Sequence, residues 1–491
     1  MSHTLAELVA GLGAQIEGPS SVGVSDVTYD SRAVRPGALF VALRGAQTDG
    51  HRFVPQAIEA GASALLVEEM PASRPAHVAI ARVPDARAAL ADVAARFFGS
   101  PARKLTLVGV TGTNGKTSTV RMIESILLAA GRPAGSLGTI SVRYPGFEEK
   151  SALTTPESLD LQRWLARMRD AGVVAVALEV SSHSLALGRV RGLSFAVGVF
   201  THLSQDHLDF HEDMESYGRA KSRLFDADHL TGTAVLNAAD PWTPRFAAVA
   251  REAGRAVITY ARGPEARADY TTVHERVELA RSHLRVRGPD AEIEIELPLA
   301  GDFQIDNALA ALAAGRALGI DWDAIRRGLE GCPPVPGRLE RVGEGRPIVL
   351  VDYAHTPDAL DRVLGRVRPL VAGRLIAVFG CGGDRDRTKR APMARAACAH
   401  ADHVIATSDN PRTEDPDAIL RDVSAGLSGS HEVLRDRREA IARAIAGAGA
   451  DDCIVIAGKG HEDYQILGRE RFPFDDREEA RRALLARGVA A

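Results

Sequence analysis

Short apolar runs alternate with helix-length amphipathic segments along almost the whole chain, a pattern typical of α/β proteins. In the first hundred residues the runs are ALFVAL (38–43) and ASALLVEE (62–69), and this stretch ends at the breaker sequence Gly-Ser-Pro at 99–101. From Lys104 onward the alternation resumes. The buried-strand candidates there are LTLVGVT (105–111), VVAVALEVS (173–181), FAVGVFTH (195–202) and AVLN (234–237).

The second half of the chain adds an antiparallel piece and a third α/β unit. Period-2 alternation around a Gly-Pro-Asp turn predicts a β-hairpin over 283–299, and a helix is expected from about Ile305 to Leu318. The proline-rich segment 332–337 predicts a stiff linker. Beyond it, buried strands are expected at 347–354, 374–380, 403–409 and 453–460.

These patterns predict three α/β domains. The first covers residues 1–100, the central one covers 101–334 and has a mainly parallel sheet, and the C-terminal one covers 335–491 and is Rossmann-like. A length of 491 residues agrees with this division, because one hydrophobic core rarely extends beyond about 250–300 residues.

Composition places the chain among ordinary globular proteins. Hydrophobic residues make up 45% and charged residues 25%, and the formal net charge is −4 with both signs interspersed, so nothing indicates nucleic-acid binding. No apolar run approaches the ~18 residues of a membrane span, and the N-terminus lacks a signal-peptide pattern. The four cysteines are scattered without CxxC spacing. We expect a cytoplasmic monomer with reduced thiols and no membrane partner.

The sequence TGTNGKTS at 111–118 points most directly to a chemistry. It stands between a predicted strand and a helical pattern over 119–130, which is the order strand, glycine-rich loop and helix N-terminus. Glycines let backbone N–H groups surround phosphate oxygens, Lys116 can reach the outer phosphates, and the Thr117 hydroxyl can bind Mg²⁺. Val110 stands where the general GxxxxGK[ST] pattern has glycine. The loop therefore predicts, in a tighter variant, a P-loop mononucleotide-binding domain for ATP or a similar nucleotide.

Further polar residues follow the neighbouring strands. Glu179 ends its strand, where a carboxylate beside a phosphate loop suits Mg²⁺·ATP and where helix capping is the alternative role. His202, His207 and His211 lie together without a nearby cysteine, so a hard-cation or phosphate role is expected for His207 and structural roles for the other two. Lys221 lies on an expected helix and by itself resembles any surface lysine.

Every expected strand of the third unit ends in a polar or charged cluster. The clusters are DYAH (352–355), GGDRDR (382–387), DNPR (409–412) and GKGHE (458–462). In open α/β sheets the ligand crevice lies outside the carboxyl ends of the strands. The four clusters are therefore expected to converge on one small charged ligand.

Taken together, these motifs resemble those of the Mur ligase family, ATP-dependent amide-forming enzymes of bacterial peptidoglycan synthesis, and hence of cell wall biogenesis, cell shape and cell division. The matching stretches run in family order along essentially the whole chain: TGTNGKTS, TTP (154–156), EVSSH (179–183), LSQDHLDFH (203–211), YGRAKSRLF (217–225), GRLE (337–340), DYAHTPD (352–358), GCGGDRDRTKR (380–390), DNPR and GKGHE. DNPR is the version found in members that add meso-diaminopimelate to UDP-N-acetylmuramoyl-L-alanyl-D-glutamate.

The resemblance implies an N-terminal domain for the UDP end of that substrate, a central ATPase domain and a C-terminal domain for the amino acid. It implies that ATP phosphorylates the γ-carboxylate of the D-glutamate and that the amine of diaminopimelate attacks the acyl phosphate, so that phosphate leaves. A carboxylate is a poor acyl donor until its oxygen becomes a good leaving group. Catalysis is then mostly positioning and charge neutralisation.

Carried over residue by residue, the resemblance implies three binding sets. ATP would be held by Gly112, Thr113, Asn114, Gly115, Lys116, Thr117, Ser118, Asn307, Arg338, Asp352 and His355. The UDP-muramoyl-dipeptide would be held by Ser31, Ala46, Gln47, Thr48, Thr154, Thr155, Ser181 and Arg189. Diaminopimelate would be held by Arg385, Asp409, Asn410, Pro411, Arg412, Gly458 and Glu462.

The resemblance also implies a catalytic and a metal set. The catalytic residues would be Lys116, Glu179, His207 and Lys221, and the Mg²⁺ ligands would be Thr117, Glu179, His207 and Lys221. Lys221 would act as a carbamate formed with CO₂, an anion able to steady a second Mg²⁺. Two positions depart from the family pattern: Leu187 replaces a common Gln near the dipeptide, and Gln304 replaces an Asn near the adenine.

Within the diaminopimelate set, the planar guanidinium of Arg412 suits a bidentate pairing with the distal carboxylate, and Asp409 or Glu462 suits an ammonium. A folylpolyglutamate synthase is disfavoured by YDSR (29–32), GAQTDGH (45–51) and DNPR. A ligase that adds L-lysine stays open. A nucleotide-switch ATPase is the alternative from another class, and it would release phosphate without either ligation substrate.

Overall fold

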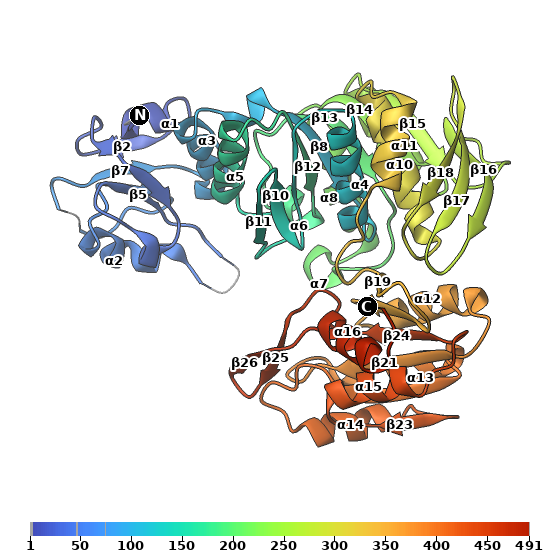
Figure 1. The fold of residues 1–491 in the computed structure, drawn as a ribbon. Coiled ribbons are helices and arrows are strands. Elements are labelled where there is room, and N and C mark those ends of the chain that lie inside the picture. Colours follow the sequence, from blue (N-terminus) through green and yellow to red (C-terminus); the bar gives the residue numbers. More distant parts are fainter. Residues whose placement is uncertain (1–2, 46–47, 74, 491) are drawn as a thin grey trace. The chain divides into compact units, whose positions relative to one another are not determined.

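The computed structural model describes residues 3–45, 48–73 and 75–490, and the chain forms two compact units (Figure 1). The first unit comprises Met1–Thr271 with Asn307–Gly328, and the second comprises Thr272–Asp306 with Leu329–Ala491. Both contain mainly parallel sheets and helices, which confirms the expected α/β class. Of the described helices, none combines the length and the apolar character needed to cross a membrane.

The first unit begins with an N-terminal α/β region that contains a five-stranded sheet and the separate strand pair β1–β3. Its elements are β1 (His3–Thr4), α1 (Leu5–Val9), β2 (Gln15–Glu17), β3 (Gly23–Val24), β4 (Asp26–Thr28), β5 (Ala38–Val41), α2 (Val54–Glu59), β6 (Ala64–Val67), β7 (Ala79–Arg82) and α3 (Ala86–Phe97). The strand order is β2-β7-β6-β5-β4, and only the β2–β7 pair is antiparallel. Strands β5 and β6 are the two expected apolar runs, and every residue in them is buried.

A second, larger sheet of the first unit carries the phosphate loop. Its elements are β8 (Thr106–Thr111), α4 (Lys116–Ala129), β9 (Ala134–Leu137), β10 (Ser141–Tyr144), β11 (Phe147–Lys150), α5 (Ser158–Asp170), β12 (Ala175–Glu179), α6 (Ser182–Ala186), β13 (Phe195–Phe200), α7 (Leu208–His211), α8 (Met214–Ser222), β14 (Leu230–Asn237), α9 (Thr243–Glu252), β15 (Ala256–Ala261) and β16 (Tyr270–Val277). Strands β9, β12, β8, β13, β14, β15 and β16 are parallel neighbours in that order. Strands β10 and β11 extend the β9 edge as an antiparallel pair.

Helices α10 (Phe303–Ala317) and α11 (Trp322–Glu330) lie beside α4 (Figure 1). Residues 308–314 of α10 are at most 2% exposed, so this helix is apolar on all sides. Two glycines allow close packing against Ile126 of α4. A Cβ on Gly328 would lie 2.5 Å from Ile126 Cα, and a Cβ on Gly315 would lie 3.2 Å from Ile126 Cγ2. Helix α4, which starts at the phosphate loop, is thereby packed closely against α10 and α11.

The second unit is built around a six-stranded sheet. Its elements are β17 (Ser282–Arg287), β18 (Glu292–Leu297), β19 (Glu340–Val342), β20 (Ile348–Asp352), α12 (Pro357–Val367), β21 (Leu375–Cys381), α13 (Arg390–His400), β22 (His403–Ser408), α14 (Pro416–Ser424), β23 (His431–Val433), α15 (Arg437–Ala446), β24 (Cys453–Ala457), β25 (Tyr464–Leu467), β26 (Glu470–Pro473) and α16 (Asp476–Ala486). The order of the six-stranded sheet is β19-β20-β24-β21-β22-β23, and only β19 is antiparallel. Strands β17 and β18 instead follow β16 in the larger sheet, and β25 and β26 form a separate pair.

Both faces of this sheet are covered by helices. Along β21, Ala377 and Phe379 belong to the core formed with α12, α13 and α14, while Ile376 and Val378 belong to the core formed with α15 and α16. Burial on both faces explains why these strands are continuous apolar runs without alternation.

Most of the expected elements are confirmed. The hairpin over 283–299 is β17–β18, the helix 305–318 is α10, and the four strands of the third unit are β20, β21, β22 and β24. The antiparallel pairs β10–β11 and β25–β26 were not anticipated, because their strands are only four residues long and lack an apolar run.

A buried ion pair joins the six-stranded sheet of the second unit to the helices on one of its faces. Arg437 Nε and Nη2 each donate to an oxygen of Asp476 at 2.7 Å, and neither side chain is exposed. Arg437 also donates to the carbonyl oxygen of Ala457 at 2.9 Å and to that of Ser408 at 3.4 Å. Those residues end β24 and β22, the two strands that flank β21, so one guanidinium joins α15 and α16 to both strand ends.

We expect Arg437→Leu to lower the free energy of unfolding of the second unit by about 3–5 kcal/mol, because it leaves the Asp476 carboxylate buried without its cation. Urea denaturation followed by circular dichroism measures the change. Arg443→Leu on the same helix is the matched control, since Arg443 is 65% exposed and pairs with Glu432 at 3.2 Å; a change below about 1 kcal/mol is expected there. Equal losses in the two variants would contradict the assignment.

Candidate active site

The phosphate loop between β8 and α4 turns through two glycines with positive φ. Gly112 has φ of 148° and Gly115 has φ of 85°. A Cβ on Gly112 would lie 1.9 Å from Thr201 Oγ1, and one on Gly115 would lie 2.4 Å from Asn307 Oδ1. Both the backbone conformation and the close neighbours therefore require glycine at these positions.

Residues after β13 hold the loop in shape. Thr201 Oγ1 donates to the Asn114 carbonyl oxygen at 2.6 Å, and the Thr113 N–H donates to the His202 carbonyl oxygen at 2.7 Å. Thr113 Oγ1 donates to the Ser204 carbonyl oxygen at 3.1 Å and accepts the Ser204 N–H at 3.0 Å. The loop is thus fixed by the protein itself, which reduces the entropy lost when a ligand binds.

Two lysines donate to the same loop carbonyl. Lys116 Nζ lies 2.9 Å from the Gly112 oxygen and 2.9 Å from the Thr113 oxygen, and Lys221 Nζ lies 2.9 Å from the Gly112 oxygen. Lys221 is only 1% exposed, so it is not a surface lysine. Burial, together with the charge of Lys116, lowers the pKa of Lys221 well below its ordinary range. Positive charge at the loop is therefore supplied by Lys116, which favours an anionic ligand, while the lowered pKa of Lys221 favours its neutral amine.

Glu179 lies at the end of β12, opposite Val110 of β8, and is 1% exposed. Its Oε1 accepts the Thr139 N–H at 2.8 Å and its Oε2 accepts the Thr139 hydroxyl at 3.0 Å. The following helix, α6, is capped by Ser181, whose Oγ accepts the Ser184 N–H at 3.1 Å. Glu179 is therefore not a helix cap, and its carboxylate is held beside the strand that leads into the phosphate loop.

The structure brings four residues of the expected dipeptide set into one hydrogen-bonded network: Thr154, Thr155, Ser181 and Arg189. The Thr155 hydroxyl donates to the Glu179 carbonyl oxygen at 2.8 Å and accepts the Ser181 N–H at 3.1 Å. Arg189 Nη1 donates to the Thr155 carbonyl oxygen at 3.3 Å, and the hydroxyl oxygens of Thr154 and Thr139 lie 3.1 Å apart. Glu179 thus places this network beside β8, the strand that leads into the phosphate loop.

Glu157 and Arg87 lie beside this network, and the sequence motifs did not predict either residue as part of the site. The Glu157 carboxylate pairs with Arg87 and lies 3.5 Å from Arg189 Nε. Glu157 directly follows the TTP motif, which was the available signal in the sequence.

The remaining members of the dipeptide set lie in the N-terminal sheet region. The Ser31 hydroxyl donates to Gln56 Oε1 at 3.0 Å, and Thr48 is exposed with its carbonyl oxygen accepting the Gly45 N–H at 2.9 Å. Ala46 and Gln47 lie outside the described residues.

Three histidine rings lie close together near Lys221. His183 is 4.8 Å from His207 and 5.5 Å from His211 between ring centroids, and His207 has φ of 53°. Burial, with help from neighbouring positive groups, lowers the pKa of His211 to about 4. His202 contributes its carbonyl oxygen to the loop instead. Across residues 3–45, 48–73 and 75–490, no group of three or more His, Cys, Asp or Glu side chains is arranged to hold a metal ion.

In the second unit, the end of β20 carries three residues of the expected ATP set. Asp352 is buried, which raises its pKa against the opposing charge of Arg338, and its two oxygens accept backbone N–H groups at 2.8 Å. The Arg338 guanidinium lies 5.2 Å from the Tyr353 ring centroid, and the His355 ring lies 4.6 Å from the same ring. Tyr353, which joins these residues, was missed because it resembles an ordinary aromatic residue after a strand.

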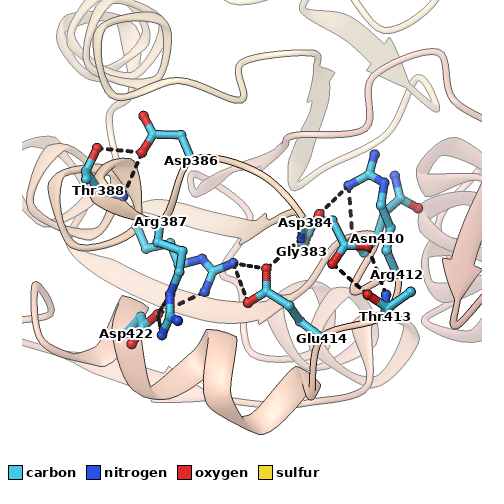
Figure 2. Close-up of polar contacts among 11 residues, drawn as sticks. Gly383, Asp384, Asp386, Arg387, Thr388, Asn410, Arg412, Thr413, Glu414 and Asp422 are labelled. Atoms are coloured by element: carbon cyan, nitrogen blue, oxygen red, sulfur yellow. Dashed lines mark hydrogen bonds and ion pairs between the residues drawn. The ribbon is translucent and has the colours of Figure 1, made fainter.

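The four clusters of the second unit do converge, because β20, β24, β21 and β22 are adjacent and parallel. Figure 2 shows how the loops after β21 and β22 are tied together. Arg412 Nη1 donates to the Gly383 carbonyl oxygen at 2.8 Å, and Glu414 accepts the Asp384 N–H at 2.6 Å. Arg390, fully buried, donates to both Glu414 oxygens at 2.8 and 2.9 Å. Arg390 was missed.

The DNPR and GKGHE clusters touch each other directly. Asn410 Nδ2 donates to Glu462 Oε2 at 2.9 Å, and Lys459 Nζ donates to Asn410 Oδ1 at 3.1 Å. A Cβ on Gly458 would lie 2.9 Å from Asp409 Oδ2, so only glycine fits beside that carboxylate. The site therefore combines acidic, basic and amide groups around one strand edge, a set suited to a zwitterionic ligand.

Four other positions can be placed. Pro411 is buried and Arg385 is exposed. Of the two departures from the family pattern, Leu187 caps the C-terminus of α6 and Gln304 is 1% exposed near the start of α10.

Three family models match successive stretches of the chain: "Mur ligase family, catalytic domain" over 23–98, "Mur ligase middle domain" over 110–315, and "Mur ligase, glutamate ligase domain" over 337–460. A protein of Gloeobacter violaceus named UDP-N-acetylmuramoyl-L-alanyl-D-glutamate--2,6-diaminopimelate ligase is 49% identical over 487 residues, 98% of each chain. A protein of Chlorobaculum tepidum with the same name is 45% identical over 490 residues, 96% of each chain. A solved structure of a ligase of that name superimposes with a TM-score of 0.75 and 34% identity, covering all of both chains.

We expect Gly115→Ala to weaken ADP binding about tenfold or more, because the new Cβ must displace the Asn307 side chain from the loop. Titration calorimetry measures the affinity. Gly131→Ala is the control: Gly131 also has positive φ, at 71°, but nothing lies within 4 Å of its Cβ. It should share the conformational penalty of about 1–2 kcal/mol and keep the affinity. Equal weakening in both variants would show that the contact with Asn307 is irrelevant.

Proposed function

The chain belongs to the Mur ligase family, and on that premise we propose that it adds meso-diaminopimelate to the D-glutamate of UDP-N-acetylmuramoyl-L-alanyl-D-glutamate in peptidoglycan synthesis, with ATP as the energy source. The observation that carries the proposal is the single charged site at four strand ends, which contains the DNPR residues in a chain 49% identical to a diaminopimelate ligase. Such a ligase also serves cell wall biogenesis, cell shape and cell division.

In the first unit the proposed role is to activate the acceptor carboxylate. ATP phosphates would lie on the loop 112–118, where backbone N–H groups, the N-terminus of α4 and Lys116 provide positive potential. Thr154, Thr155, Ser181 and Arg189 would hold the muramoyl-dipeptide, and the shared network with Glu179 supports their placement beside the transferred phosphoryl group. Phosphorylation makes the carboxylate oxygen a good leaving group, so holding the reactants together supplies much of the catalysis.

The donor set beside the loop fits Mg²⁺, which prefers hard oxygen ligands. The Thr117 hydroxyl lies in the first turn of α4, and the Glu179 carboxylate is held by Thr139 beside the same strand ends. Bound Mg²⁺ would neutralise charge on the phosphate oxygens. His207 and a carbamylated Lys221 complete the proposed set, and the burial of Lys221 against the Gly112 carbonyl supports its place there.

In the second unit the proposed role is to hold the nucleophile. Arg412 would pair with the distal carboxylate of diaminopimelate, and Asp409 or Glu462 would receive its ammonium. Lysine has no distal carboxylate, so an arginine here favours diaminopimelate. We further propose Arg338, Asp352 and His355 as nucleotide contacts, and a cytoplasmic monomer of three domains over 1–100, 101–334 and 335–491. The three separate family matches support the domain division.

The reaction is tested by ligation assays with meso-diaminopimelate, lysine or ornithine, following ADP release. Rapid release is expected only when ATP, the UDP-linked dipeptide and diaminopimelate are all present, because the acyl phosphate needs the nucleophile to proceed. Comparable turnover with lysine would establish the lysine-adding alternative. ADP release that is indifferent to both substrates would establish the nucleotide switch.

Arg412→Lys should raise the KM for diaminopimelate about thirtyfold while the KM for ATP stays within about threefold, because one ammonium cannot replace a bidentate guanidinium. Steady-state kinetics measures both constants. Arg435→Lys is the matched control, since Arg435 is exposed and pairs only with Asp417 at 3.3 Å among the ion pairs of the described residues. An unchanged KM for diaminopimelate in Arg412→Lys would exclude Arg412 as the carboxylate ligand.

A further inference from the structure

A fully buried lysine lies beside the amino-acid site, and none of the roles above uses it. Lys459 follows Gly458 after β24 and is 0% exposed. A buried ammonium costs several kcal/mol unless it is paired. Here Nζ donates to Asn410 Oδ1 at 3.1 Å and lies 3.4 Å from Glu462 Oε2, while the Tyr464 ring centroid is 5.4 Å away. The ammonium is thus paired with the Glu462 carboxylate and hydrogen-bonded to the Asn410 amide, and both residues belong to the proposed diaminopimelate set.

Lys459 decides which way the Asn410 amide points. An ammonium only donates, so the Asn410 atom that faces it must be the oxygen. The Ile466 N–H donates to the same Oδ1 at 3.0 Å. With Oδ1 held by two donors, Nδ2 is directed to Glu462 Oε2 at 2.9 Å. Removal of Lys459 takes away one of the two donors to Oδ1, so only the Ile466 N–H and the Nδ2 contact with Glu462 then oppose a flip of the amide.

Glu462 is fixed by the same arrangement. Its Oε2 accepts hydrogen bonds from Asn410 Nδ2 and Lys459 Nζ, so one of the two carboxylate oxygens is already bound by the protein. The Lys459 charge also compensates the carboxylate in a poorly hydrated place. Without it, the negative charge of Glu462 would be less stable and its side chain less restricted.

We propose that Lys459 is a positioning residue that sets amino-acid selectivity, acting through Asn410 and Glu462 without touching the substrate. The inference rests on the proposed function of this site as the one that receives diaminopimelate. Selectivity between two diamino acids depends on polar groups being held in one orientation, because a mispositioned donor or acceptor loses its hydrogen bond and keeps its desolvation penalty.

The test is steady-state ligation by the full-length Lys459→Met enzyme. Its KM for meso-diaminopimelate should rise about tenfold or more, with kcat and the KM for ATP within about threefold, since the phosphate loop is unaltered. The preference for diaminopimelate over lysine, measured as the ratio of kcat/KM values, should fall about tenfold. Lys104→Met replaces an exposed lysine and serves as the control.

A combined variant separates positioning from general support of the fold. If Lys459 acts through Asn410 and Glu462, adding Lys459→Met to a variant that carries both Asn410→Ala and Glu462→Ala should change kcat/KM by less than about threefold. Independent, multiplicative effects would overturn the proposal. So would an equal loss of kcat with every amino acid accompanied by a lower Tm, because that is the signature of a structural role.

Should Lys459→Met not fold, Lys459→Arg replaces it and keeps the charge. Its guanidinium cannot reproduce the geometry of one ammonium between Asn410 and Glu462, so the KM for diaminopimelate should rise about threefold to tenfold. An unchanged KM in that variant would overturn the proposal. If the wild-type enzyme ligates lysine and not diaminopimelate, only the proposed function fails, because the same variants can then be compared with lysine.

Discussion

Parallel strands buried on both faces leave only their carboxyl ends free for chemistry, and both large sheets of this chain obey that constraint. In the first unit, the ends of β8 and β12 carry the phosphate loop and Glu179. In the second unit, the ends of β20, β21, β22 and β24 carry the four charged clusters. The buried Arg437–Asp476 pair hydrogen-bonds two of those ends, so this strand edge is held by groups with no exposed side-chain surface.

The two sites differ in their electrostatics. At the phosphate loop, Lys116 donates to two loop carbonyl oxygens and brings a positive charge, which suits a polyphosphate. At the amino-acid site, Lys459 is balanced by Glu462, and Arg412 is bound to a backbone carbonyl. A balanced site suits a zwitterion, because such a ligand brings equal numbers of both charges.

Motifs that are continuous in sequence could be predicted, because strand, loop and helix follow one another and the chemistry depends on residue types at short spacing. The phosphate loop and the convergence of four strand ends are of this kind. Lys459, Arg437 and Arg390 could not be assigned, because only tertiary burial distinguishes them from surface charges. The β25–β26 hairpin was also missed, since its stability depends on neighbours distant in the sequence rather than on its own apolar residues.

That hairpin is joined to the DNPR loop largely through the main chain. The Arg412 N–H donates to the Ile466 carbonyl oxygen at 3.1 Å, and the Gly468 N–H donates to the Arg412 carbonyl oxygen at 2.7 Å. Backbone hydrogen bonds of this kind are indifferent to side-chain identity. The outward-facing side chains of the hairpin can therefore change while these main-chain bonds continue to hold Arg412, so the hairpin surface is uncoupled from the conformation of a residue proposed to bind the amino acid.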